Sequence, residues 1–208
     1  EKLNKQDSNT DETNADDKQS DDSAVTTQAE TEAPTDSDGK NILVAYFSRA
    51  DENYNVGTID KGNTQIIAEY IASEVGADSF HIETVTPYPA DYDDCCDVAK
   101  QELADKARPE LSGTIDNMEQ YDIVMIGYPN WWASIPMPVA SFLEEYDFTG
   151  KTIIPFCSHG GGRFGQSLTA ITKLVPDAVM GEALSVHYSG GSELPDDVTE
   201  WLKTNGIK

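Results

Sequence analysis

The chain has 208 residues and a formal net charge of −24, and hydrophobic residues make up 38% of it. So large a negative charge disfavours nucleic acid and anionic lipid surfaces as partners, and no stretch is long and apolar enough to span a bilayer. Three cysteines are too few for a disulfide framework, and the three histidines lie in separate segments without metal-ligand spacing, which argues against a metal site.

Residues 1–39 differ in composition from the rest of the chain. Twelve acidic and three basic residues give this stretch −9 of the total charge, and it has almost no large apolar residue. We therefore expect residues 1–39 to be a disordered acidic tail and residues 40–208 to form one domain. Such a leader suits a tether on an exported, cell-surface protein, with any membrane anchor upstream of residue 1. A cytoplasmic protein is the alternative.

Strand and helix patterns alternate through residues 40–208. In chain order, apolar runs predict strands at about 42–47, 79–85, 123–127, 152–157 and within 182–188. Three-four spacing, caps and prolines predict helices at about 63–75, 92–106 and 138–145, one ending near 174, and one at 195–204. The first, third and fourth strands are continuously apolar, which is typical of central strands. These patterns predict an α/β fold with three layers, a doubly wound five-stranded parallel sheet in the order 2-1-3-4-5.

Three distinctive loops follow the first, third and fourth strands. In a sheet of this kind, ligands bind outside the carboxyl ends of the strands, at the point where the strand order reverses. The three loops should therefore converge on one edge of the sheet, and their convergence predicts a single binding site there.

The first loop begins with Ser48, Arg49 and Ala50 and ends where a helix begins, at Asn63 and Thr64. Hydroxyl and amide donors, one cation and the free N–H groups of a helix N-terminus suit a phosphate monoester. The alternative is an ordinary strand-to-helix turn capped by Asn63. This loop contains neither GxGxxG nor GxxxxGK[ST], which disfavours a dinucleotide or a nucleoside triphosphate there.

The second loop contains two adjacent tryptophans, in Pro129-Asn130-Trp131-Trp132-Ala133. An indole supplies a large flat apolar face that suits a flat ring ligand. We expect one of the two tryptophans to pack in the core beneath the loop, with Trp132 the better candidate to contact a ring. Asn130 could reach the polar edge of the same ring.

The third loop, residues 158–165, is rich in glycine, so its backbone N–H groups can approach a ligand closely. Candidates to bond a ring edge are Ser158, Gly160, Gly161 and Gly162. His159 either orients a ligand or is solvated. The His-Gly-Gly-Gly run also resembles the oxyanion-hole stretch of lipases and esterases, but the chain has no GxSxG nucleophile elbow, which argues against a hydrolase.

The cysteines are expected to be unreactive. Cys95 and Cys96 are adjacent on a predicted helix, where a vicinal redox pair is the alternative, but no Lys, Arg or His is next to them in sequence to activate a thiol. Cys157 lies in an apolar strand and is expected in the core.

Taken in order, the runs ILVAYFSRA (42–50), GNT (62–64), GYPNWWA (127–133) and SHGGGRFG (158–165) resemble the flavodoxin family. The resemblance extends over residues 41–208 and is strongest to flavodoxin-like proteins of Gram-positive and gut bacteria, many of which are exported. It implies a flavodoxin-like fold, noncovalent FMN and electron transfer. It assigns FMN contacts to Ser48, Arg49, Ala50, Asn63, Thr64, Pro129, Asn130, Trp131, Trp132, Ala133, Ser158, His159, Gly160, Gly161, Gly162 and Phe164. An insertion at 51–62, longer than the family's usual phosphate loop, adds Tyr54, Asn55 and Val56 as residues that could fold over the ligand.

Two functions fit this resemblance. As a carrier, the domain would pass electrons between redox partner proteins. As an enzyme, it would be an NAD(P)H-dependent FMN oxidoreductase that reduces a small acceptor such as a quinone. No nicotinamide-binding fingerprint follows the first strand, which favours the carrier. A domain that has lost FMN and serves as a binding module is a third alternative.

Overall fold

The structure, a computed structural model, describes residues 39–207. The expected acidic tail lies outside these residues, except for Gly39. Within the described part of the chain, no helix is both long enough and apolar enough to cross a membrane.

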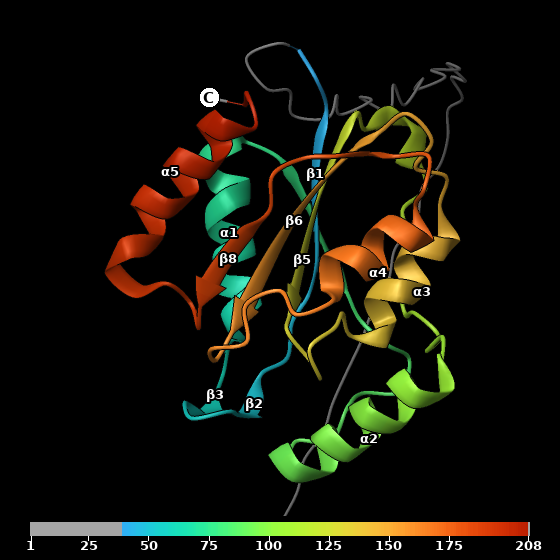
Figure 1. Cartoon of the computed structure of the whole chain (residues 1–208), viewed down its shortest axis with the longest axis vertical. Coiled ribbons are helices and arrows are strands. Elements are labelled where there is room, and N and C mark those ends of the chain that lie inside the picture. The colour runs from blue at the N-terminus through green and yellow to red at the C-terminus, as the bar shows by residue number, and fades with distance from the viewer. Residues whose placement is uncertain (1–38, 208) are drawn as a thin grey trace, which may run out of the picture. The chain divides into compact units, whose positions relative to one another are not determined.

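A parallel sheet forms the centre of the domain (Figure 1). Its strands are β1 (Ile42–Phe47), β4 (Asp78–Ile82), β5 (Ile123–Pro129), β6 (Thr152–His159), β7 (Val179–Met180) and β8 (Leu184–His187). The order is β4-β1-β5-β6, and both β7 and β8 pair with β6. The expected order 2-1-3-4-5 is therefore confirmed, with the fifth strand divided into two pieces.

The break between β7 and β8 has a local cause in the C-terminal helix. The Asn205 side chain accepts a hydrogen bond from the Glu182 N–H and donates one to the Glu182 carbonyl, at 2.9 and 3.1 Å. The Trp201 indole donates to the same carbonyl. Both backbone groups of Glu182 are thus bonded to side chains, and the strand is interrupted there.

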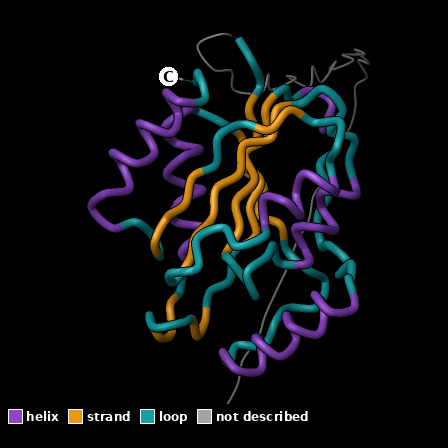
Figure 2. Tube along the Cα trace, in the orientation of Figure 1, coloured by secondary structure: helices purple, strands orange, loops and turns teal. Residues whose placement is uncertain are grey.

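Helices cover both faces of the sheet (Figure 2). They are α1 (Asn63–Val75), α2 (Tyr92–Asp105), α3 (Met137–Glu145), α4 (Ser167–Leu174) and α5 (Leu194–Thr204), with short 3-10 segments at Met118–Gln120 and Gly191–Glu193. The bounds of α1 agree with the sequence prediction, and the others agree to within one or two residues where both ends were predicted. Gly62 is the N-cap of α1 and Asn63 is its first residue, so the alternative of a turn capped by Asn63 is wrong.

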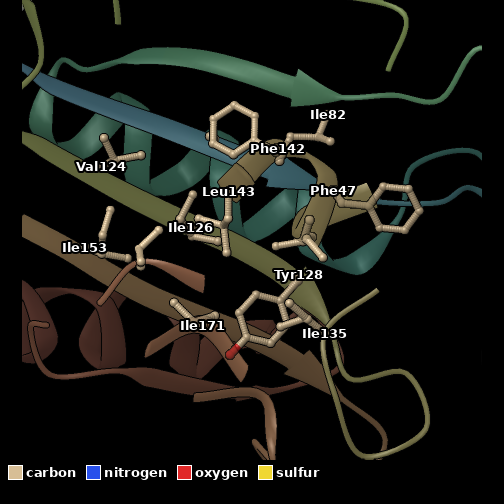
Figure 3. Packing of buried hydrophobic residues seen from close by; sticks show 14 of the residues in the cluster. Phe47, Ile82, Val124, Ile126, Tyr128, Ile135, Phe142, Leu143, Ile153 and Ile171 are labelled. Atoms are coloured by element: carbon tan, nitrogen blue, oxygen red, sulfur yellow. The ribbon is translucent and has the colours of Figure 1, made fainter. Parts of the chain in front are cut away.

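Alternate residues of each strand point to opposite faces and build two separate cores. Ile42, Val44 and Tyr46 of β1 pack with α1 and α5, whereas Leu43, Ala45 and Phe47 belong to the cluster on the other face. Figure 3 shows that cluster, which includes Phe142 and Leu143 of α3, and the Phe142 ring stacks on that of Phe80 in β4 with centroids 5.8 Å apart. The buried Tyr128 hydroxyl is satisfied by Ser167 Oγ at 2.8 Å. Two filled cores fix the positions at which the strands end.

Helix α2 and a small hairpin extend beyond the carboxyl ends of the strands (Figure 1). The hairpin pairs β2 (Asp51–Asn53) with β3 (Gly57–Ile59) in antiparallel fashion and lies within the insertion after β1. Only two residues of α2, Cys95 and Ala99, are buried, whereas six residues of the shorter α3 are. Helix α2 and the hairpin thus lie at the edge of the sheet at which the ligand site was expected.

Candidate functional site

A cavity of about 890 Å³ lies where the three loops meet the hairpin and α2. The first loop contributes Ser48, Arg49, Asn63 and Thr64 to its lining. The second contributes Pro129, Asn130, Trp131, Trp132 and Ala133, and the third contributes Ser158, His159, Gly160 and Gly162. The predicted convergence of the loops is thus present in the structure.

Four other predicted residues do not line the cavity: Ala50, Asn55, Gly161 and Phe164. Asn55 lies in the hairpin turn, with a positive φ of 57°. Phe164 packs against the hydrophobic cluster under α3 and α4. The Gly161 N–H donates to the ring of His159, so this glycine supports the loop from outside the lining.

Hydroxyl groups and a helix N-terminus form the inner end of the cavity. Ser48 Oγ accepts a hydrogen bond from the Gln65 N–H at 3.1 Å and so caps α1 from the preceding strand. The hydroxyls of Thr64 and Ser158, both buried, lie 2.7 Å apart and join the first loop to the third. Gly62 permits this arrangement, because a Cβ at that position would lie 2.2 Å from Ser48 Oγ.

Arg49 lines the cavity, but its guanidinium is bonded to backbone carbonyls. It donates to the carbonyls of Glu52, Pro89 and Ala90, at 2.5 to 3.1 Å. The Glu52 N–H also donates to the Ala90 carbonyl. These bonds join the hairpin to the residues before α2, so Arg49 positions that wall instead of presenting free donors to an anion.

The two adjacent tryptophans have different environments. Trp131 packs edge-on against Phe47 and Tyr88, with ring centroids 5.2 and 5.1 Å apart. Trp132 is 49% exposed and lines the cavity. Its indole N–H donates to the Cys96 carbonyl at 3.0 Å, which joins the second loop to α2. The expected division between a packing and a cavity-lining tryptophan is therefore present.

Trp132 and Ala133 form the centre of a strained turn. Their φ values are 50° and 56°, and Trp131 and Ser134 exchange backbone hydrogen bonds on either side. Left-handed backbone is costly for residues other than glycine, by roughly 1–2 kcal/mol each. The Ala133 carbonyl accepts from the Gln166 N–H at 2.7 Å, which helps to hold the turn over the cavity. Such strain is often found at ligand sites.

Side-chain hydrogen bonds fix the third loop. The Asn130 amide donates to the Arg163 carbonyl, and the Asn130 N–H donates to the Ser158 carbonyl at 2.8 Å. His159 Nδ1 accepts from the Gly161 N–H, and its Nε2 lies 2.9 Å from Ser185 Oγ. Burial lowers the pKa of His159, and His187 and Arg163 lower it further. The ring is therefore neutral, as an Nδ1 acceptor requires.

The outer side of the cavity comes from residues that were not predicted as ligand contacts. They are Asn53 and Tyr54 of the hairpin, Tyr92, Asp93, Cys95, Cys96, Asp97 and Ala99 of α2, and Tyr188 after β8. Tyr54 had been noted only as a residue that could fold over a ligand. Its ring lies against Gly160, where a Cβ would come within 2.6 Å of the ring. An Asn-Val-Gly turn at 55–57 is the sequence signal that could have identified the hairpin.

Cys95 and Cys157 are thiols in these environments. Burial raises the pKa of Cys95 to about 11, against a smaller opposite effect of Arg49. Burial also raises the pKa of Cys157 to about 12, as its expected core position implies. No group of three or more His, Cys, Asp or Glu residues within 39–207 could hold a metal ion.

Comparison with known proteins identifies the family. A family model described as flavodoxin matches residues 41–205. A flavoprotein structure from Bacteroides eggerthii is 31% identical, covers 81% of this chain and 99% of its own, and superposes with a TM-score of 0.67. One from Bacteroides uniformis is 27% identical over 79% and 98%, with a TM-score of 0.65. No curated protein matches significantly.

A third structure shows the same fold at lower identity. It is a flavoprotein from Lactobacillus acidophilus in complex with FMN, 18% identical over 78% of this chain and 98% of its own, with a TM-score of 0.58. The matched family model spans all three loops and every strand of the sheet. This chain belongs to the flavodoxin family.

Proposed function

We propose that this domain binds FMN in the cavity at the carboxyl edge of the sheet and transfers electrons through it. The observation that carries the proposal is the convergence of the three loops on one cavity, in a chain of the flavodoxin family. A protein of the same fold is solved with FMN, so this fold accommodates the cofactor. The flavin supplies the redox chemistry, and the protein supplies binding and electrostatics.

The inner end of the cavity has the donors that a phosphate monoester needs. The bond between Thr64 and Ser158 uses one hydroxyl hydrogen, so one of the two hydroxyls retains a hydrogen for another acceptor. Ser48 Oγ accepts from Gln65, and its own hydrogen is available in the same way. The N–H groups in the first turn of α1 add fixed donors and a favourable dipole.

The loops beyond the phosphate end suit a flat heteroaromatic ring. Trp132 offers a large apolar face at the cavity wall, and Gly160 and Gly162 leave backbone groups accessible there. The neutral His159 ring supports the glycine-rich loop through the Gly161 N–H. These residues would bind and orient the ring.

The proposal is tested by reconstituting the protein with FMN, removing free flavin and recording the absorption spectrum. We expect retained flavin bands and weaker binding of riboflavin, which lacks the phosphate. Ser48→Ala should weaken FMN binding and leave riboflavin binding nearly unchanged. Absence of retained flavin would overturn the proposal.

Trp132→Ala tests the ring end of the same site. If the indole stacks on the flavin, FMN affinity should fall by roughly 1–3 kcal/mol, as for other base–aromatic stacks. Riboflavin affinity should fall by the same amount, because both ligands carry the ring. Unchanged affinity for both would assign Trp132 to the turn alone.

An electron carrier and an FMN oxidoreductase both fit the proposed function, and they differ in their redox partners. A carrier would pass electrons to a redox partner protein, and an oxidoreductase would take them from NAD(P)H and reduce a quinone. Stepwise reduction of the FMN-loaded protein with and without NADH distinguishes them, because only the oxidoreductase is bleached directly by NADH.

A further inference from the structure

Two carboxylates line the outer side of the cavity. Asp93 and Asp97 are four residues apart on α2, so they share one face of that helix. No ion pair within the described residues includes either of them. The donors of Arg49, the cationic residue of the lining, are bonded to the carbonyls of Glu52, Pro89 and Ala90. The two carboxylates outnumber the single guanidinium charge of Arg49 in the lining, so the net charge there favours a cation.

Aromatic rings lie around the same carboxylates. Tyr54 and Tyr92 line this side with ring centroids 6.1 Å apart, and Trp132 faces it from the second loop. Aromatic faces attract cations as well as flat apolar rings. Lys100 Nζ already lies over the Trp132 ring, 5.2 Å from its centroid, so the rings of Tyr54 and Tyr92 are the ones open to a cationic ligand.

The two ends of the cavity thus have opposite preferences. The inner end, at Ser48 and Thr64, has hydroxyl and N–H donors, which suit an anion. The outer side has carboxylates and aromatic faces. The cavity volume of about 890 Å³ is near the upper end of the usual range of small-molecule sites, roughly 300–1,000 Å³.

We propose that the outer side of the cavity, between α2 and the hairpin, is a second subsite that binds a small flat aromatic cation beside the flavin. This inference rests on the proposed function and names the class of its small redox partner. Asp93 and Asp97 supply charge selectivity, and Tyr54 and Tyr92 supply the apolar faces. The same carboxylates disfavour polyanionic ligands such as a pyrophosphate-bearing dinucleotide.

The test uses the full chain loaded with FMN and two probes of the same size. N-Methylquinolinium is a fused two-ring cation, and 2-naphthoate is a fused two-ring anion. Neither probe absorbs visible light, so the visible spectrum reports retained FMN, and equilibrium dialysis measures the free probe in the protein-free chamber. A double variant, Asp93→Asn with Asp97→Asn, is compared with Asp94→Asn with Asp105→Asn. The control removes the same charge from α2 at positions that do not line the cavity.

We expect the cation to bind more tightly than the anion and to add to bound FMN without releasing it. The Asp93/Asp97 variant should weaken cation binding about tenfold at low salt, and the control variant by less than about twofold. Equal binding of the two probes, equal effects of the two variants, or release of FMN by the cation would each overturn the subsite. Failure of the chain to retain FMN would overturn the proposed function instead. Comparing cation binding by the two double variants without FMN would then still test whether Asp93 and Asp97 select for a cation.

Discussion

The inner and outer sides of the cavity are held in place by different interactions. The inner side consists of loops that continue directly from β1, β5 and β6, whose side chains fill two buried cores. The outer side consists of α2, which buries only Cys95 and Ala99, and a three-residue-stranded hairpin. Arg49 and a few other polar contacts join these outer segments. The inner side therefore combines hydrogen bonds with packing on two buried cores, whereas the outer side depends mainly on hydrogen bonds, and the two should respond differently to substitution.

Trp131→Ala tests the packed side and should have the largest effect. The Trp131 ring packs edge-on against Phe47 and Tyr88, so its removal leaves a cavity at the end of β1. We expect the free energy of unfolding to fall by about 3 kcal/mol, measured by urea denaturation. Trp132→Ala is the matched control and should change the free energy of unfolding much less, because Trp132 is 49% exposed. Similar decreases in the free energy of unfolding in both variants would contradict the view that Trp131 is packed and Trp132 is exposed.

Arg49→Gln tests the hydrogen-bonded side. The carbonyls of Glu52, Pro89 and Ala90 would lose a charged donor, at a local cost of about 2 kcal/mol. We expect faster amide hydrogen exchange at Glu52 and Tyr92, whose N–H groups bond across the two segments, and little change in the sheet.

Arg108→Gln is the control for this variant. Arg108 also bonds to carbonyls and to the Glu144 carboxylate, but it does not line the cavity. Faster exchange at Glu52 and Tyr92 in the control, or exchange in Arg49→Gln that rises equally across the sheet, would show that Arg49 has no specific role in the wall.

The smallest expected effect is a pH dependence on the packed side. The pKa of His159 is lowered in the folded protein, so the folded state binds fewer protons there than the unfolded state, whose His pKa is about 6.5. The contribution of neutral His159 to the free energy of unfolding is therefore complete above pH about 6.5. It is lost as the pH falls through the lower pKa of the folded state. Protonation of Nδ1 would also break the bond from the Gly161 N–H.

Urea denaturation at pH about 7.5 and about 5.5 measures this dependence. The loss of stability on acidification should be smaller in His159→Asn, whose side-chain oxygen can accept from the Gly161 N–H without titrating. His187 and Arg163 remain in both proteins, so the difference between the two profiles isolates His159. Identical pH profiles for the two proteins would show that His159 does not contribute to the pH dependence of stability.

The parts of this protein that local patterns predicted are those built from consecutive residues. The α1 bounds follow from a three-four apolar pattern, and the strand order follows from which runs are continuously apolar. Because parallel strands end at the same edge of a sheet, the convergence of the three loops followed from that order. Separate environments for Trp131 and Trp132 were also expected, because a loop that follows a buried strand has one covered side and one open side.

Contacts between distant segments were decided only by the tertiary structure. Arg49 bonds to carbonyls about forty residues away, whereas its sequence neighbours suggested an anion ligand. The α2 pattern predicted a helix but not its location at the cavity, because a helix that buries so little has no strong apolar face to place it. Asp93 and Asp97 of α2 and Tyr54 of the hairpin line the cavity, and sequence patterns did not predict these positions either. Periodicity reports which face of an element is covered, and only the folded chain brings together the polar groups that bond across the site.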